Sequence, residues 1–365
     1  MRTLVLNAGS SSLKLSVVED ETNIVAEQDF EAAEGRLDET RLASEIRSMG
    51  SVDAVGHRVV HGGPKYPSSV RIDGEVVRYL VTITDLAPLH LPAALAGISA
   101  AREVLPRVPA VACFDTAFHS KMPGAASTYA IPAEWRERYG IRRYGFHGFA
   151  HSYDSRRAAE LLGRPISELR IVTCHLGAGA SLAAVRAGRS VDTTMGFTPL
   201  EGLVMATRSG TVDPGVLLYL ERHAGMGEPE LTEALDRKGG LIALAGTPDM
   251  RQVLEHIAAG DDQAELAFDV YVHRLRGMIA AMAAAMGGLD AIVFSGGVGE
   301  NAPPVRAATA DGLKFLGVEI GPTLNASLGP DSDISAPTAR VRTLVIKARE
   351  AIEVAREVRR VVGAA

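Results

Sequence analysis

The chain has 365 residues, of which 47% are hydrophobic and 22% charged, and its formal net charge is −6. This length is typical of two domains of ordinary size, and the composition is that of a globular chain rather than a disordered one. The negative charge argues against nucleic acid and anionic membranes as main partners, but a few local cations would still hold a small anionic ligand.

Strand-like and helical segments alternate along the chain, a pattern typical of α/β proteins. Residues 2–20 read as a strand, a Gly-Ser-Ser-Ser turn and a second strand. Short β-branched runs at 52–64 and 107–119 each end in polar residues. The segment 170–194 again reads as strand, small-residue turn and strand, and 289–301 as a buried strand that runs into a glycine-rich turn.

Two helices are predicted in the last third of the chain. Residues 264–286 carry one apolar stripe at helical spacing, which indicates a core-facing helix rather than a methionine-lined cofactor site. The last helix is predicted at about residues 347–362, with its many charged residues on a solvated face.

The hairpins at 2–20 and 170–194 lie about 165 residues apart and share one plan. This internal repeat predicts a duplicated α/β domain with a cleft between the copies. Turns this poor in side chains let backbone amides approach a ligand, so one such turn in each half predicts a polyphosphate held from both sides. The alternative is two coincidental hairpins.

The cysteines and the hydrophobic runs indicate the compartment. Cys113 and Cys174 are too few for a disulfide framework and lie among apolar residues, so we interpret them as core thiols in a reducing compartment. The longest run without Asp, Glu, Lys or Arg, 86–101, is interrupted by Pro88 and Pro92. Since the N-terminus also lacks a signal-peptide pattern, we expect a cytoplasmic protein without membrane spans.

Several cations are candidates for chemistry, each with a plainer alternative. Lys14 follows the serine-rich turn without a Walker pattern, and a lone lysine in a strand is usually just exposed. Arg58 lies within a β-branched run, where it either pairs with an internal acid or faces a cleft. Arg208 lies between small residues that leave it open to a ligand.

The candidate histidines and acids are ambiguous in the same way. His147 and His151 are four residues apart, but neighbouring glycines and the lack of further nearby ligands argue against zinc. Asp115 follows an apolar strand, where open α/β sheets carry functional side chains. Glu350 begins the last helix and is equally explained as a surface acid. Only the combination of these residues is specific.

In combination, the segments resemble the acetate kinase family over essentially the whole chain. The stretches that carry the resemblance are NAGSSSLK, GHRVVHGG, FDTAFH, RRYGFHG, HLGAG, DTTMGFTPLEGL, TRSGTVDPG, SGGVGEN and AREAIEVAR, in family order. The resemblance implies the sugar kinase, heat-shock ATPase and actin superfold, with two duplicated actin-like/ribonuclease H-like domains and an active-site cleft between them. We expect an N-terminal acyl-kinase domain at 1–149 plus 352–365, and a C-terminal nucleotide-binding domain at 150–351.

The resemblance also implies roles for individual residues. It assigns Asp115, His147 and Arg208 to catalysis, and Asn7 and Glu350 to a Mg²⁺ ion, for which Mn²⁺ is an alternative. The implied substrate-binding residues are Arg58, Val60, Leu89, Phe146 and Pro199. The implied nucleotide-binding residues, for ATP or ADP as co-substrate, are Ser10, Ser12, Lys14, His175, Leu176, Gly177, Ala178, Gly179, Asp249, Met250, Arg251, Gly297, Val298, Gly299, Glu300 and Asn301.

The chemistry of acyl phosphate formation explains these residue types. A carboxylate titrates at about pH 4, so the acceptor is already ionised and needs no strong base. The harder task is to bring this anion to the triphosphate and to support charge on three equatorial oxygens during in-line transfer. Arg58 would dock the carboxylate, while Arg208 and His147 would surround the migrating group with the metal ion. We expect Asp115 to orient a metal-bound water or Arg208 rather than to act as a base.

The chain departs from the family pattern on the nucleotide side and beside the active site. The usual HLGNG is here HLGAG, so Ala178 supplies no amide side chain, and the usual GFHGTSH is GFHGFAH. APLHLP carries Leu91 where the family has Asn, and GLIALAGTPDMR is one residue shorter than the family's adenosine segment.

The predicted reaction is reversible, Mg-dependent transfer of the γ-phosphoryl group of ATP to acetate, giving acetyl phosphate and ADP, in a homodimer. A propionate kinase is a close alternative, because one methylene in an apolar pocket is worth only about 1–3 kcal/mol. A pyrophosphate-dependent acyl kinase is a further alternative. From other classes, a nucleotide-switched actin- or chaperone-like protein and an inactive paralogue remain open.

Overall fold

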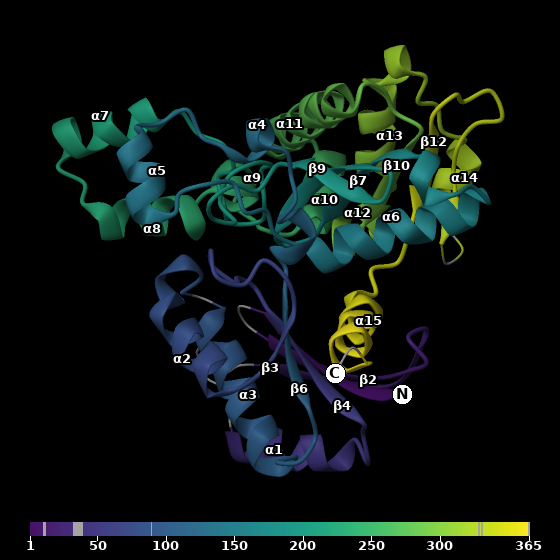
Figure 1. Cartoon of the computed structure of the whole chain (residues 1–365). Helices are drawn as coiled ribbons and strands as arrows, with labels where there is room; N and C mark the ends of the chain where they lie inside the picture. The colour runs from purple at the N-terminus through teal and green to yellow at the C-terminus, as the bar shows by residue number, and fades with distance from the viewer. Residues whose placement is uncertain (10–11, 32–38, 89, 328, 330, 364–365) are drawn as a thin grey trace. The chain divides into compact units, whose positions relative to one another are not determined.

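The structure is a computed structural model that describes residues 1–9, 12–31, 39–88, 90–327, 329 and 331–363. The chain divides into two compact units (Figure 1). Unit 1 comprises Met1–Ser120, Phe146–Tyr153 and Arg349–Ala365. Unit 2 comprises Lys121–Gly145 and Asp154–Ala348.

Unit 1 is built on a sheet with the strand order β3-β2-β1-β4-β6-β5. Its strands are β1 (Arg2–Ala8), β2 (Ser12–Glu19), β3 (Asn23–Glu31), β4 (Ala54–Val59), β5 (Val70–Arg71) and β6 (Ala110–Phe114). Its helices are α1 (Glu39–Ser48), α2 (Gly74–Thr82), α3 (Leu91–Val104), the start of α6 (Gly148–Leu162) and α15 (Glu350–Gly363). β1 runs parallel to β4 and β4 parallel to β6, while β2 is antiparallel to β1.

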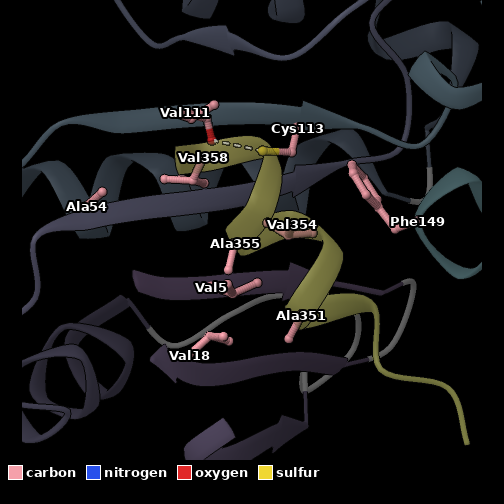
Figure 2. Close-up of a cluster of buried hydrophobic side chains, with 10 residues drawn as sticks. All are labelled: Val5, Val18, Ala54, Val111, Cys113, Phe149, Ala351, Val354, Ala355 and Val358. Carbon is pink, nitrogen blue, oxygen red and sulfur yellow. Dashed lines mark hydrogen bonds between the residues drawn. The ribbon is translucent and has the colours of Figure 1, made fainter. Parts of the chain in front are cut away.

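The sheet of unit 1 packs closely against the C-terminal helix α15. Figure 2 shows Val354 and Val358 of this helix among buried side chains of the sheet. A methyl group at Gly56 of β4 would lie only 2.7 Å from Val358 and 2.8 Å from Val354, so glycine is what permits this approach. Each fully buried valine contributes about 1.5–3 kcal/mol of transfer free energy, which holds α15 on the sheet.

Unit 2 has the strand order β11-β12-β10-β7-β8-β9. Its strands are β7 (Arg170–Leu176), β8 (Ala180–Arg186), β9 (Arg189–Thr193), β10 (Ala291–Ser295), β11 (Ser332–Asp333) and β12 (Arg342–Val345). Its helices, besides the rest of α6, are α4 (Gly124–Ser127), α5 (Ala133–Tyr139), α7 (Pro214–Ala224), α8 (Glu228–Asp236), α9 (Gly240–Ala245), α10 (Met250–Ala258), α11 (Asp262–Met286), α12 (Gly296–Asn301), α13 (Pro303–Asp311) and α14 (Pro322–Ala326).

The two sheets repeat one topology. In unit 2, β7 is antiparallel to β8 and parallel to β10, and β10 is parallel to β12. β7 and β8 therefore take the places that β1 and β2 take in unit 1. This repeat confirms the duplicated α/β fold that the two hairpins predicted.

The predicted core helix of unit 2 is α11. Asp261 caps its N-terminus by accepting hydrogen bonds from the backbone N–H groups of Gln263 and Ala264, and the helix ends at Gly287 in the left-handed conformation. Its stripe is buried at Tyr271 and Met286, as expected for a core-facing helix. Across the part of the chain that the structure describes, no helix combines the length and apolar character needed to span a bilayer.

Candidate active site

In unit 1, the predicted polar residues gather where three parallel strands end. The register pairs Asn7 of β1 with Arg58 of β4, and Arg58 with Cys113 of β6. Asp115 follows β6 directly, and its backbone N–H donates to the carbonyl of Val59 at 3.1 Å. Because parallel strands present their carboxyl ends at one edge of a sheet, three residues far apart in sequence become neighbours.

Hydrogen bonds join these residues into one cluster, which also includes Glu350 at the start of α15. Arg58 Nε donates to Asp115 Oδ1 at 2.9 Å, and Arg58 Nη2 to Asp115 Oδ2 at 2.6 Å. Arg58 Nη1 donates to Asn7 Oδ1 at 2.9 Å, and Asn7 Nδ2 donates to Glu350 Oε2 at 2.9 Å. The four side chains are the cluster that we call the strand-end cluster.

The electrostatics of the strand-end cluster depend on burial and on two acids around one cation. Burial by itself would lower the pKa of Arg58, but Asp115 and Glu350 raise it above its usual range, so the guanidinium is always charged. Burial raises the pKa of Asp115, and the attraction of Arg58 opposes that shift. The bidentate contact is the strong kind of charge-assisted hydrogen bonding, which fixes the guanidinium plane.

The geometry leaves part of Arg58 available to a ligand. A guanidinium has five N–H donors. Three of them are used by Asp115 and Asn7, so within the described ranges one N–H on each Nη is left without a protein acceptor. The sequence left open whether Arg58 pairs with an internal acid or faces a ligand, and the structure shows the pairing with Asp115.

His147 lies beside this cluster on a strained turn. Its φ is +56°, in the left-handed region that residues with a Cβ rarely adopt. The backbone N–H of His147 donates to the Asp115 carboxylate, and that of Gly148 donates to the Asp115 carbonyl at 3.1 Å. A Cβ at Gly148 would lie 2.1 Å from that carbonyl oxygen, so the turn requires glycine there. On the other side, His119 Nε2 lies 3.0 Å from the carbonyl oxygen of Phe146, to which it donates.

Other predicted residues of unit 1 are placed as follows. Val60 and Phe146 are buried, and the ring of Phe146 meets that of His61 edge-on at 5.6 Å. Lys14 forms an ion pair with Glu27 across the hairpin at 2.9 Å, with both side chains about two-fifths exposed. Leu89 and Ser10 lie outside the described residues, as does the side chain of Ser12.

Unit 2 contains an apolar cavity of about 620 Å³ beside the ends of β7 and β10. The predicted nucleotide residues that line it are Gly177, Ala178, Asp249, Met250, Arg251, Gly297, Val298 and Asn301. Its further lining residues, which the sequence did not single out, are Ala206, Leu241, Pro248, Leu254, Tyr271 and Ala302. Most of these are apolar, and a pocket of this size and character suits a nucleoside.

The glycine-rich turn after β10 is shaped by its contact with β7. Gly296 has a φ of +76°, and a Cβ there would lie 2.8 Å from the carbonyl oxygen of Leu176. Gly297 by contrast faces open space, since a Cβ there would meet no atom within 4 Å. The backbone at Gly297 is therefore open to close approach by a ligand.

Not every predicted nucleotide residue points its side chain at the cavity. Glu300 Oε1 accepts hydrogen bonds from the backbone N–H groups of Gly296 at 3.0 Å and Ala348 at 2.9 Å. Its carboxylate thus braces the turn. Asp249 caps α10 and forms an exposed pair with Arg251 at 2.6 Å, and this arginine lowers the pKa of Asp249. His175, Leu176, Gly179 and Gly299 lie in or beside the same turns.

Arg208 lies on a loop of unit 2 that also carries Pro199. Arg208 Nη1 donates to the Pro199 carbonyl at 3.4 Å, a long contact, and burial lowers the pKa of Arg208 against the opposing charge of Asp236. Arg143 binds residues on both sides of Pro199. Arg143 pairs with Glu201 at 2.6 Å and donates to the carbonyls of Thr194 and Met195.

A metal ion fits unit 1 only if the oxygens of a bound phosphate supply some of its ligands. In the part of the chain that the structure describes, no group of three or more His, Cys, Asp or Glu side chains is arranged to hold a metal. Mg²⁺ is usually held by one or two carboxylates together with waters and substrate phosphates, rather than by an all-protein cage. The amide oxygen of Asn7 and the carboxylate of Glu350 are donors of that type, and the two side chains lie in contact through Asn7 Nδ2, which donates to Glu350 Oε2.

Fold and site together define a class. A duplicated α/β fold that carries an arginine–carboxylate cluster on one unit and a nucleoside-sized cavity on the other is that of a phosphotransferase of the actin-like superfold. The Acetokinase family matches residues 21–356, and the chain belongs to this family.

Individual relatives agree. The chain is 49% identical over 390 residues to an acetate kinase of Synechococcus sp., covering 96% of each. Among solved structures it is similar to Porphyromonas gingivalis acetate kinase (TM-score 0.91, 35% identity) and to a Francisella tularensis propionate kinase (TM-score 0.89, 34% identity), covering 99% of each chain. Membership of this family favours the predicted phosphotransferase over a nucleotide-switched filament or chaperone protein.

Proposed function

We propose that the protein acts as an acetate kinase, transferring the γ-phosphoryl group of ATP to acetate and giving acetyl phosphate and ADP, reversibly. The observation that carries the proposal is Arg58, which Asp115 and Asn7 hold while one N–H on each Nη stays available. Two N–H donors of one guanidinium suit the two oxygens of a carboxylate. No base is needed, because the acceptor is already an anion at neutral pH.

The remaining substrate contacts follow from the apolar residues. We assign Val60, Leu89, Phe146 and Pro199 to the pocket for the methyl group of acetate. Val60 and Phe146 are buried, in agreement with an apolar surface. Propionate would be accepted with a modest loss, because one methylene changes binding by only about 1–3 kcal/mol.

Charge stabilisation falls to Arg208 and His147. Phosphoryl transfer places charge on the equatorial oxygens, so a guanidinium and an imidazole supplied to them lower the barrier. We assign Asp115 a positioning role, because its carboxylate binds Arg58 through two hydrogen bonds and also accepts from the backbone N–H of His147. Asp115 would then hold both groups in place rather than take a proton.

The nucleotide and the metal ion complete the assignment. We assign Asn7 and Glu350 as ligands of Mg²⁺, which neutralises phosphate charge when bound. Residues 150–351 would bind ATP, and residues 1–149 with 352–365 the acyl group. The apolar cavity of about 620 Å³ supports ATP over pyrophosphate, because pyrophosphate has no base or ribose to fill it.

A hydroxamate assay with ATP, Mg²⁺ and a series of carboxylates from formate to butyrate tests the function. We expect acetate to give the highest kcat/KM, with propionate next, and pyrophosphate to fail as donor. Arg58→Gln should raise the KM for acetate strongly, whereas Arg71→Gln, an exposed arginine on β5, should leave it unchanged. If ATP bound but no acyl phosphate formed at any acetate concentration, the proposal would be wrong.

We also propose a cytoplasmic homodimer. Support comes from α7, where Leu218 and Tyr219 are 62% and 61% exposed and none of the helix residues is buried. A second copy of the chain would cover this apolar surface. Sedimentation velocity should show a dimer that Leu218→Lys dissociates, while Leu266→Lys on α11, also an exposed leucine, should not. A monomeric wild-type protein at micromolar concentration would contradict this.

A further inference from the structure

Asp154, Ser295 and His175 of unit 2 form a hydrogen-bonded chain. His175 and Ser295 begin the motifs HLGAG and SGGVGEN, but no sequence pattern joined them to Asp154. Asp154 lies on α6, Ser295 ends β10, and His175 is the last residue but one of β7. The parallel register of β7 and β10 pairs Ser295 with His175. Asp154 and Ser295 have no exposed surface, whereas His175 is partly exposed.

The distances make a continuous relay from the core to the edge of the sheet. Ser295 Oγ donates to Asp154 Oδ2 at 2.5 Å, and His175 Nδ1 lies 3.1 Å from Ser295 Oγ. A hydroxyl has one hydrogen, and an ionised carboxylate only accepts. Since Ser295 gives its hydrogen to Asp154, its oxygen accepts from Nδ1–H of His175. The relay therefore selects the tautomer in which Nδ1 is protonated and Nε2 is the outer nitrogen.

The relay lies directly behind the two turns that border the cavity. His175 is followed within two residues by Gly177, and Ser295 within two residues by Gly297, and both glycines line the cavity. The contact between Ser295 and His175 thus links the two turns at the strand ends where they begin. It also holds the imidazole in one orientation. This orientation is the same for the neutral ring, in which Nε2 carries a lone pair, and for the ring that is protonated at Nε2 beside a phosphate.

We propose that Asp154 and Ser295 are positioning residues that fix the ring of His175, with Nδ1–H bonded to Ser295 and Nε2 presented to the phosphates of the nucleotide. The proposal rests on the nucleotide site of the proposed function, and it identifies what orients one of that site's residues. The ligand chemistry is a nucleoside di- or triphosphate.

The tautomer of His175 in the full-length protein is the direct test. Ring ¹⁵N chemical shifts, with the His175 signals assigned by their loss in His175→Gln, distinguish the two neutral tautomers. We expect the wild-type protein to show Nδ1 protonated, and Ser295→Ala to lose that preference. Thr173→Val is the matched control, because Thr173 carries a buried hydroxyl on β7, the strand of His175, and donates to the Ala183 carbonyl instead. An Nε2-protonated neutral ring in the wild type would overturn the relay without any variant.

Nucleotide binding is the second readout. Ser295→Ala and Asp154→Asn should weaken ADP binding about tenfold in calorimetry, as expected for a lost hydrogen bond to an orienting group. The KM for ATP should rise while the KM for acetate stays the same, and Thr173→Val should change neither. Unaltered ADP affinity in folded Ser295→Ala would overturn the proposal. A wild type that bound ADP but made no acetyl phosphate would instead refute the proposed function and leave the tautomer result valid.

Discussion

The two units place different chemistry at one position of the same fold. In unit 1 the register pairs Asn7 with Arg58, and in unit 2 it pairs His175 with Ser295. Each pair occupies the sixth residue of the central strand and the fifth of its parallel neighbour. In each unit a buried aspartate then completes the set, Asp115 beside Arg58 and Asp154 beside Ser295.

The difference between the pairs is charge. Unit 1 places a guanidinium between two carboxylates, which fixes its plane while one N–H on each Nη is left for a ligand. Unit 2 places a hydroxyl and an imidazole beside glycine-rich turns that border the apolar cavity, where the backbone at Gly297 faces open space. The topology fixes where functional side chains lie, and the side chains decide what binds.

The largest expected effect is on kcat, when Arg208 of unit 2 is replaced. Arg208→Gln should lower kcat by about 10³–10⁵, the range found when an arginine that stabilises phosphoryl transfer is removed. Steady-state kinetics of acetyl phosphate formation measure this. Arg274→Gln, an exposed arginine on α11, is the control and should retain full activity. A kcat within tenfold of wild type for Arg208→Gln would show that this residue does not act on the transferred group.

The contrast in charge between the two pairs predicts unequal costs in stability. Arg58→Gln leaves Asp115 as a buried charge without its partner, so the free energy of unfolding should fall by about 3–5 kcal/mol. Ser295→Ala removes one hydrogen bond to the buried Asp154 but no charged partner, and should cost about 1–3 kcal/mol. Urea unfolding of both variants measures the two values. Equal losses would mean that the strand-end cluster is not held by charge.

Two glycines test which turn tolerates a side chain. Gly148→Ala would press a methyl group against the carbonyl of Asp115, 2.1 Å away, and displace His147. We expect kcat to fall by about 10², as for a catalytic group moved by roughly 1 Å. Gly297→Ala enters open space and should change stability by less than about 0.5 kcal/mol. Activity and thermal unfolding of both variants decide, and a fully active Gly148→Ala would remove the argument for a strained catalytic turn.

The smallest effect concerns acid stability, which should differ between the units. Burial lowers the pKa of His57 to about 3 and that of His61 and His119 to about 4, all three in unit 1. In the unfolded chain these groups titrate at about 6.5, so the unfolded state binds protons first as the pH falls. Their contribution is complete above pH 6.5 and declines between pH 6.5 and about 4, by roughly 2 kcal/mol for each histidine at about pH 5.

Urea titrations at pH 7.5 and about pH 5 measure this decline. In His57→Leu the free energy of unfolding should depend less on pH, by the contribution of one histidine, because the buried ring that resists protonation is gone. His256→Asn on α10 is the control, because that histidine is exposed in the folded protein. A slope that His57→Leu left unchanged would mean that His57 gains a proton without unfolding.

Local patterns in the sequence carried much of the architecture. The two hairpins predicted a duplicated α/β fold, and helical spacing predicted α11 and α15 within a few residues of their observed bounds. The long family motifs identified the class of enzyme. These features are readable because strand and helix periods repeat over neighbouring residues, and because a turn such as that at Gly296 needs glycine for steric reasons.

Partnerships between distant residues were not readable in the same way. The sequence could not decide whether Arg58 paired with an acid, and Asp115 is 57 positions away. Glu300 was expected at the nucleotide, yet its carboxylate braces two backbone N–H groups. The Asp154–Ser295 bond joins residues 141 positions apart, and no motif marked it.

The sequence by itself determined the strands, the helices, the repeat and the family, because each is encoded in short-range spacing or in contiguous motifs. Only the tertiary structure decided which side chain each buried aspartate binds, since strand register and parallel crossover connections bring those groups together. Hydrogen bonds act over about 3 Å in space, a distance that separation along the chain does not predict.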